Sequence, residues 1–268
     1  MIKNKIAEYL IRRAVAMHSI KHSDLANWEP WLGCRQISEA CKNCYYYSQD
    51  SSSFAKAKFQ KTDDFYKPRS KIPSGKLVAT CFMTDFFIEQ ADDFRNEAWQ
   101  IIKNRTDLTF IILTKRIKRV EQCLPKDWGD GYDNVVLGCT IENQKRADER
   151  LPIFAKLPVK YKFISCVPLL EKIDLSMYLD TIKFVAVGGE IGKNARLCDY
   201  NWVLDVREQC IQNNATFWFK NSGSRLMYNG NVKNIHPIFQ NNFAKKSNIN
   251  VLQIENLDVR QAFGKGTI

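Results

Sequence analysis

Short apolar runs alternate with helix-like stretches over most of the chain after residue 76. Six of the runs are rich in β-branched and aromatic residues: KLVATCF, LTFIILT, NVVLGCT, YKFISCV, IKFVAVG and ATFWFK. Amphipathic stretches lie between them, among them QADDFRNEAWQIIKNR, ENQKRADERLPIFAKL and YNWVLDVREQCIQNN. Strands that are apolar on both faces and alternate with helices are typical of a parallel sheet covered by helices.

One more strand is expected near residues 27–31. Seven strands predict an α/β fold built as a full or partial parallel (β/α) barrel, with a doubly wound open sheet as the alternative. The predicted organisation is an N-terminal amphipathic helix or extension over 1–26, a barrel over 27–223 and an irregular C-terminal appendage over 224–268. The first βα connection is then a long loop over 31–76. Its second half is rich in Lys and Arg, which is typical of an exposed basic loop or lid.

Polar residues follow five of the predicted strands, where functional groups of parallel β/α folds gather. They lie in MTD (83–85), TKR (114–116), TIEN (140–143), GGE (188–190) and KNSG (220–223). Asp85 and Glu142 either cap the helices that follow or face this edge. The basic stretch LTKRIKR is either a solvated turn or an anion site at a helix start. Gly188, Gly189 and Glu190 form either a tight turn or a ligand contact.

Three of the nine cysteines are clustered: six residues separate Cys34 from Cys41, and two separate Cys41 from Cys44. Zinc takes four ligands in a structural site, or three and a water in a catalytic one. A 4Fe-4S cluster can instead be held by three thiolates, which leaves one iron open. The spacing of the three cysteines does not distinguish zinc from a 4Fe-4S cluster. The odd number of cysteines in a long chain favours a reducing, cytoplasmic compartment over a secreted disulfide scaffold.

The chain is basic, with a net charge of +11 and a sequence pI near 9.2. Such a charge favours an anionic partner, most often nucleic acid, although a lysine-rich proteome produces the same balance. No apolar run approaches the roughly 18 residues that span a bilayer, so no membrane partner is expected. No nucleophile elbow, phosphate-binding glycine loop or zinc-protease helix is present in the sequence.

Taken in order, several motifs resemble one family. They are NWEPWLGCRQISEACKNCYYY, MTDFF, ILTKR, LGCTIENQKRADERLP, SCVPLL, VGGEIGKNAR and WFKNSG. Over residues 27–223 the chain is similar to the phage and prophage proteins described as radical-SAM-like three-cysteine proteins. The resemblance implies a radical S-adenosylmethionine (SAM) β/α barrel. In that superfamily three cysteines hold a 4Fe-4S cluster, and SAM binds its open iron.

Carried onto this sequence, the resemblance implies that Cys34, Cys41 and Cys44 are the cluster ligands. It makes Gly188, Gly189, Glu190 and Tyr45 candidates for cofactor binding. Asp85, Lys115 and Glu142 become candidate catalytic residues, and Thr114 joins them at the cavity rim. The chain departs from the superfamily pattern in its six-residue gap, in Asn43 before the last cysteine and in a GGE that follows a late strand. Val167 stands where a Glu is common in the closer family.

These observations predict an enzyme that generates a 5′-deoxyadenosyl radical and modifies an anionic substrate. A nucleobase or nucleic acid fits the charge, and an external electron donor is expected as a partner. Two alternatives remain: a non-catalytic nucleic-acid-binding protein whose cysteines hold zinc or a structural iron–sulfur cluster, and a radical enzyme acting on a small metabolite or peptide.

Overall fold

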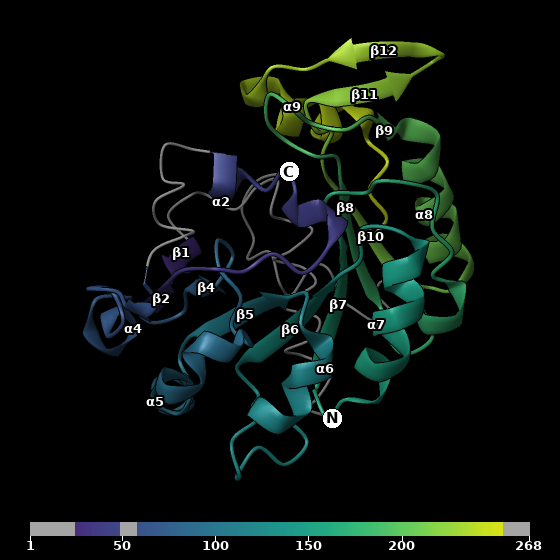
Figure 1. The fold of residues 1–268 in the computed structure, drawn as a ribbon. Coiled ribbons are helices and arrows are strands. Elements are labelled where there is room, and N and C mark those ends of the chain that lie inside the picture. Colours follow the sequence, from purple (N-terminus) through teal and green to yellow (C-terminus); the bar gives the residue numbers. More distant parts are fainter. Residues whose placement is uncertain (1–24, 49–57, 254–268) are drawn as a thin grey trace, which may run out of the picture.

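The structure is a computed structural model that describes residues 25–48 and 58–253. Seven parallel strands form one sheet in the order β1-β4-β5-β6-β7-β8-β10, and the sheet curls into a half-barrel (Figure 1). The strands are β1 (Leu25–Trp28), β4 (Leu77–Thr80), β5 (Thr109–Thr114), β6 (Val135–Thr140), β7 (Tyr161–Cys166), β8 (Phe184–Gly188) and β10 (Thr216–Asn221). All seven predicted strands are therefore confirmed. Their order along the sheet follows the chain without reversal, which excludes the doubly wound alternative.

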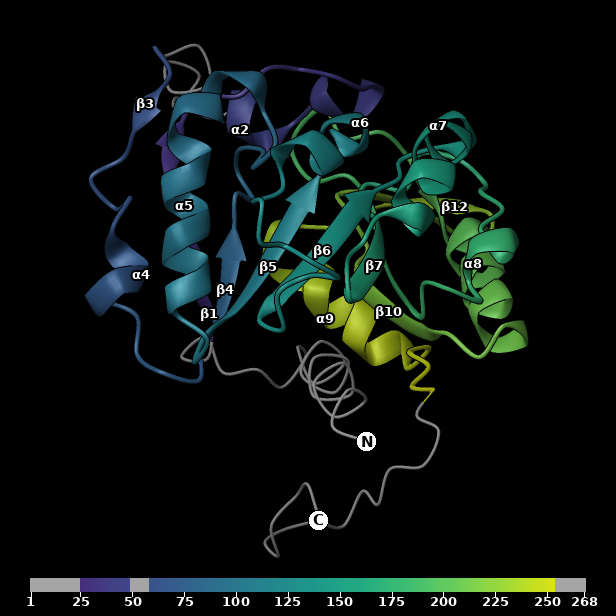
Figure 2. The same ribbon diagram turned by 90° about the horizontal axis from the view of Figure 1, so that it is seen from below.

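Helices in the connections cover the outer face of the sheet, with α5, α7 and α8 along it in Figure 2. The helical elements are η3 (Glu39–Cys41), α2 (Tyr45–Ser48), α4 (Lys67–Ser70), η4 (Glu89–Ala91), α5 (Asp92–Asn104), α6 (Ile117–Val120), η5 (Glu121–Cys123), α7 (Gln144–Lys156), η6 (Ser176–Tyr178), α8 (Tyr200–Gln212) and α9 (Pro237–Ser247). The three amphipathic stretches of the sequence form α5, α7 and α8, as predicted. Within the described residues, no helix has the length and hydropathy that crossing a bilayer requires.

The two faces of the sheet carry different apolar clusters. Phe110 and Ile112 of β5 are fully buried beneath the helices, whereas Ile111 and Leu113 point to the inner, concave face and are only partly buried. The inner face is itself apolar; its buried members are Leu77, Val136, Phe163, Phe184, Ala186 and Trp218. This double-sided burial is why the strands read as continuous apolar runs.

The basic segment 58–76 does not form a lid over the barrel. It begins with β3 (Gln60–Lys61), which pairs antiparallel with β2 (Trp31–Leu32). Phe65 and Ile72 are buried in the outer core, and α4 lies beside α5 in Figure 2. Many residues of the segment are exposed, as expected, but Phe65 and Ile72 anchor it against the helical layer beside the barrel.

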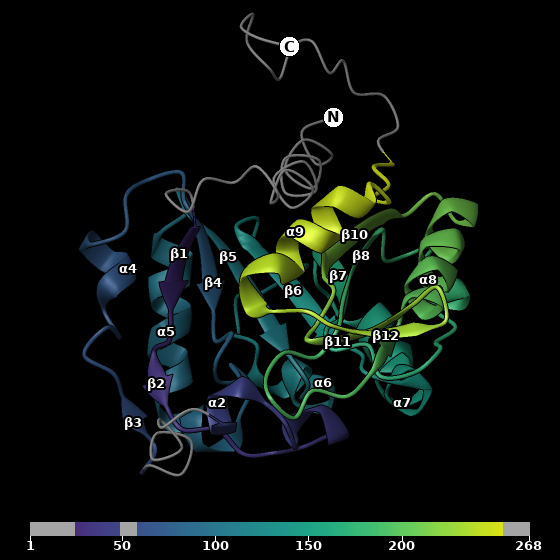
Figure 3. The ribbon, with the colours of Figure 1, turned by 90° about the horizontal axis from the view of Figure 1, so that it is seen from above.

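The described part of the C-terminal region is regular, which corrects the prediction of an irregular appendage. A three-stranded sheet joins β9 (Cys198–Asp199), β11 (Arg225–Tyr228) and β12 (Asn231–Asn234), and α9 follows it against β10 (Figure 3). An antiparallel bridge between Val251 and Phe217 protects the β10 edge of the main sheet. The N-terminal helix or extension predicted over 1–26 lies outside the described residues, except for Leu25 and Ala26, which begin β1.

Candidate functional site

The segment that carries the three cysteines, residues 33–47 (the cysteine loop), lies along the C-terminal edge of the sheet. One side of the loop is held by contacts with residues just past β4 and β5. Tyr45 Oη donates a hydrogen bond to the backbone oxygen of Phe82, just past β4, over 2.9 Å. Arg116, just past β5, donates from Nη2 to the backbone oxygen of Arg35 over 2.7 Å. The loop is therefore tied to two neighbouring strand ends.

Contacts with the ends of β6 and β8 hold the other side of the loop. Ser38 Oγ donates to Oε1 of Glu142, which follows β6 and is fully buried. The second carboxylate oxygen of Glu142 accepts from Arg150 Nη1 over 2.6 Å. Asn43 Nδ2 donates to Glu190 Oε2, just past β8, over 3.1 Å. The cysteine loop is thus the common partner of four of the five polar strand ends, those of β4, β5, β6 and β8.

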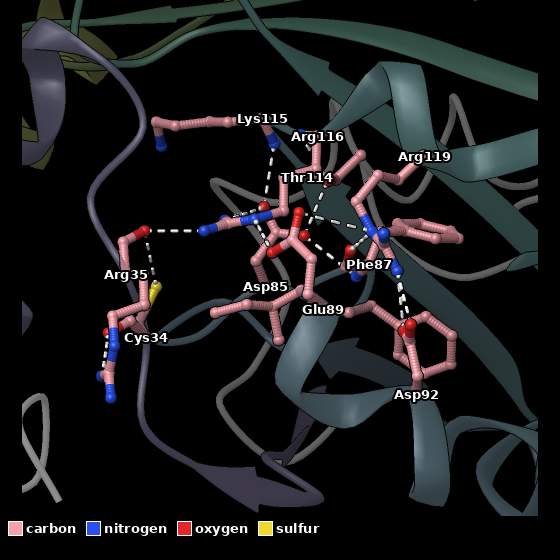
Figure 4. Close-up of polar contacts among 12 residues, drawn as sticks. Cys34, Arg35, Asp85, Phe87, Glu89, Asp92, Thr114, Lys115, Arg116 and Arg119 are labelled. Carbon is pink, nitrogen blue, oxygen red and sulfur yellow. Dashed lines mark hydrogen bonds and ion pairs between the residues drawn. The ribbon is translucent and has the colours of Figure 1, made fainter. Parts of the chain in front are cut away.

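Asp85 joins the ends of β4 and β5 (Figure 4). Its Oδ1 accepts from Thr114 Oγ1 over 2.7 Å and from the Phe87 backbone N–H over 3.0 Å. Its Oδ2 accepts from the Lys115 backbone N–H over 3.1 Å and from Arg116 Nη1 over 3.2 Å. Asp85 and Arg116 are both buried. Asp85 is therefore the centre of a buried network and not the helix cap that was one interpretation of the sequence.

The basic stretch LTKRIKR does not present four free cations. Arg116 pairs with Asp85, and Arg119 donates to both carboxylate oxygens of Asp92 (Figure 4). The helix that follows, α6, has only four residues. These two arginines hold neighbouring loops together, so their charges are already matched by carboxylates and Arg116 is buried. Lys115 lies near Cys44 and favours its thiolate.

Glu142 does not cap α7 either. Asn143 occupies the N-cap and accepts from the Arg146 backbone N–H over 2.9 Å. Asn is among the residues most favoured at this position because its side-chain oxygen satisfies an unpaired N–H of the first turn. Glu142 therefore does not cap α7, and its carboxylate accepts hydrogen bonds from Ser38 and Arg150.

The GGE stretch follows β8 as a tightly packed turn. A Cβ atom on Gly188 would lie 2.9 Å from Asn221 Nδ2, and one on Gly189 would lie 2.5 Å from Ser222 O. Both glycines are thus required by the neighbouring chain. Glu190 is buried and accepts from the Arg196 backbone N–H and Nε over 2.8 and 2.9 Å. Burial alone would raise the pKa of Glu190, but these hydrogen bonds hold it below the ordinary value.

The three thiols lie in one electrostatic environment. Burial raises the pKa of Cys34 to about 11; Asp85 adds to the rise, Arg116 opposes it, and Cys41 and Cys44 contribute as well. Burial also raises the pKa of Cys44. All three cysteines are free of disulfides. The thiols of Cys34 and Cys44 are therefore protonated at neutral pH, so a metal that bound them would displace protons.

The cysteine loop supplies three thiols, the donor type that both zinc and iron–sulfur sites use. Three thiols come from one short segment, and cations at Arg116 and Lys115 favour the thiolates of Cys34 and Cys44. In the part of the chain that the structure describes, no three His, Cys, Asp or Glu side chains are grouped closely enough to hold one metal ion. Cluster binding would therefore require the three sulfur atoms to approach one another.

Glu29 is a residue of this region that the sequence patterns did not single out. It lies between β1 and β2, and its carboxylate accepts from the Met83 and Thr84 backbone N–H groups over 2.9 and 3.2 Å. Thr84 Oγ1 adds a third hydrogen bond over 2.7 Å. Burial raises the pKa of Glu29 despite these donors. Glu29 fell within the strand expected near residues 27–31, but β1 ends at Trp28, so Glu29 directly follows the strand.

A comparison with known families matches most of the chain to one of them. Residues 18–255 match the family model described as Protein of unknown function (DUF5131). The chain belongs to the DUF5131 family. Neither a curated protein nor a solved structure matched it. Because the family description states no activity, the resemblance to radical-SAM-like three-cysteine proteins stays a prediction.

Proposed function

We propose that this DUF5131 protein is a radical SAM enzyme whose 4Fe-4S cluster is held by Cys34, Cys41 and Cys44. The observation that carries the proposal is the course of the cysteine loop. Its contacts hold the segment that carries the three thiols along the C-terminal edge of a curled parallel sheet, where the functional groups of β/α barrels lie. Three thiolates leave one iron of a cubane open for SAM.

When bound, the cluster and SAM would supply a 5′-deoxyadenosyl radical that abstracts hydrogen from a substrate. The protein's own residues have three tasks in this proposal. The cysteine thiolates hold the iron, and the positive charges of Lys115 and Arg116 favour those thiolates. The hydrogen bonds of Tyr45 and Asn43 fix the loop over the sheet. Glu190 would contact the amino group of SAM, and an external donor would supply the electron.

The substrate is proposed to be anionic, of the nucleobase or nucleic-acid class, and the compartment cytoplasmic. The net charge of +11 supports the anionic class. Asp85, Lys115 and Glu142 stay candidates for the rim, but Asp85 and Glu142 are already committed to buried partners.

Release of 5′-deoxyadenosine tests the proposed function. Anaerobically reconstituted protein, mixed with SAM and dithionite, should produce 5′-deoxyadenosine, and the Cys41→Ala variant should not. Stoichiometric zinc in protein made without oxygen, with no deoxyadenosine released, would favour the non-catalytic zinc protein instead.

Replacing Glu190 by Gln should weaken SAM binding while cluster content is retained. The amide keeps the shape of the side chain but loses the charge that would attract the amino group of SAM. A charge-assisted hydrogen bond contributes about 1.5–3 kcal/mol, so the dissociation constant should rise roughly ten- to hundredfold. Equilibrium dialysis with labelled SAM measures it.

Glu39→Gln is the matched control, because Glu39 lies within the cysteine loop and, like Glu190, pairs with an arginine, Arg146. Glu39 is exposed, so this variant should bind SAM like the parent protein. Equal SAM affinity in the Glu190 and Glu39 variants would remove Glu190 from the proposed cofactor site and leave it as the partner of Arg196.

A further inference from the structure

The concave face of the half-barrel holds a cavity of about 260 Å³. Its wall is mostly apolar, with aromatic rings from β7, β8 and β10; these include Tyr161, Phe163, Phe184 and Trp218. We call it the inner cavity. Small-molecule sites have this composition: a largely apolar wall with a few placed polar groups.

Four lysines line the inner cavity, and three of them donate to groups elsewhere. These are Lys160 to Asp133, Lys162 to the backbone oxygen of Ala155, and Lys183 to the backbone oxygen of Asn213. Lys220 of β10 is different. Within the described residues it has neither a hydrogen bond nor an ion pair, and burial lowers its pKa. An ammonium group held in an apolar wall without a counter-charge is costly unless a ligand supplies one.

Further polar groups lie on the same face. Ser165 of β7 is buried and lines the inner cavity. Its neighbour in register on β6, Thr140, is buried too, and the Thr140 hydroxyl has no hydrogen-bond partner among the described residues. Such hydroxyls can donate to an oxyanion. The wall is thus largely apolar, with three lysines that are paired elsewhere, one lysine without a partner among the described residues, and nearby hydroxyl donors. This combination suits an anionic head group on an apolar body.

The inner cavity also reaches the cysteine loop. Phe82 lines the cavity, and its backbone oxygen accepts the hydrogen bond from Tyr45, the residue after Cys44. A molecule in the cavity would therefore lie close to the segment that carries the thiols.

We propose that the inner cavity binds a small molecule with an aromatic or aliphatic body and one anionic group, and that Lys220 pairs with that group. Aromatic acids and mononucleotides share this chemistry. This proposal deepens the proposed function. It rests on that function only in taking the bound molecule to be the substrate. Binding itself needs neither the cluster nor SAM.

Two fluorescent probes with the same rings test the proposal: 8-anilinonaphthalene-1-sulfonate, which is anionic, and N-phenyl-1-naphthylamine, which has no charge. Lys220→Met should raise the dissociation constant of the sulfonate about tenfold or more, because a charge-assisted contact is lost. The same variant should leave the affinity for the uncharged probe within about twofold, since the apolar wall is retained.

Lys183→Met is the matched control, because Lys183 lines the same cavity but already has a partner; it should bind both probes like the parent. Ala186→Phe should weaken both probes, because Ala186 is buried in the cavity wall and the larger ring would fill the space. Unchanged sulfonate affinity in Lys220→Met would overturn the proposal, as would unchanged binding of both probes in Ala186→Phe. Cys34→Ala should leave probe binding intact, so a failure of the cluster assignment would be distinguished from a failure at the inner cavity.

Discussion

Replacing any one of Cys34, Cys41 and Cys44 by Ala should abolish cluster assembly. Protein reconstituted without oxygen should hold about four irons and four sulfides per chain, bound through these three thiolates. With one thiolate removed, two protein ligands cannot retain a cubane that already has one open iron. Iron and sulfide analysis, together with the brown colour of the protein, measures the loss.

Two other cysteines of the chain provide matched controls. Cys123 is partly buried near Arg119, and Cys210 is buried in α8; both lie on helical segments away from the cysteine loop. Cys123→Ala and Cys210→Ala should retain the iron and sulfide of the parent protein. If these variants lost the cluster as completely as the loop variants, or if zinc but no iron remained bound to the parent, the three-thiolate assignment would fail.

Adding SAM to the reduced protein should also change the electron paramagnetic resonance spectrum of the cluster, because SAM would occupy its open iron. This readout depends on the open coordination position and not on stability alone. It therefore separates a cluster that binds SAM from one that only stabilises the loop.

The sheet was predictable because each strand can be identified from its own residues. Residues on both faces of β6 and β8 are buried, so each strand appears as an unbroken apolar run. The alternation of such runs with amphipathic helices then predicts parallel strands in chain order. Nothing in this inference depends on contacts between distant residues.

The contacts of the cysteine loop could not be predicted in the same way. Ser38 and Glu142 are 104 residues apart, and Asn43 and Glu190 are 147 apart. No local pattern pairs such residues, because the pairing depends on the path of the loop across the strand ends. The pairing within the basic turn could not be predicted for the same reason, because Asp85, the partner of Arg116, lies 31 residues away.

The C-terminal region was missed because α9 is stabilised by tertiary contacts more than by its own pattern. Its sequence, PIFQNNFAKKS, has polar residues where a strong apolar stripe would help identify a helix. Gln240 and Ala244 are nevertheless buried, and the chain beyond α9 pairs with β10 through Val251. Such stabilisation by the rest of the fold commonly overrides weak local propensity.

Glu142→Gln should destabilise the fold strongly, because it leaves the buried Arg150 without a counter-charge. Both residues are almost completely excluded from solvent, and their closest N–O distance is 2.6 Å. Removing one partner of a buried pair costs about 3–5 kcal/mol of unfolding free energy. Urea unfolding followed by circular dichroism measures this loss as a lower midpoint at unchanged slope. Because Ser38 donates to the same carboxylate, the variant should also loosen the cysteine loop.

Helix α7, which carries Arg150, also supplies a control pair of the same chemistry. Glu149 pairs with Arg146 over the same 2.6 Å, but both side chains are more exposed to solvent. Glu149→Gln should therefore lower the unfolding midpoint far less than Glu142→Gln, since exposed pairs are screened by water. Replacing Glu142 and Arg150 together by Leu and Met should recover part of the loss, because no unpaired charge then stays buried. If Glu142→Gln proved no more costly than Glu149→Gln, Glu142 would not be held there for stability, and its candidacy as a catalytic carboxylate would gain weight.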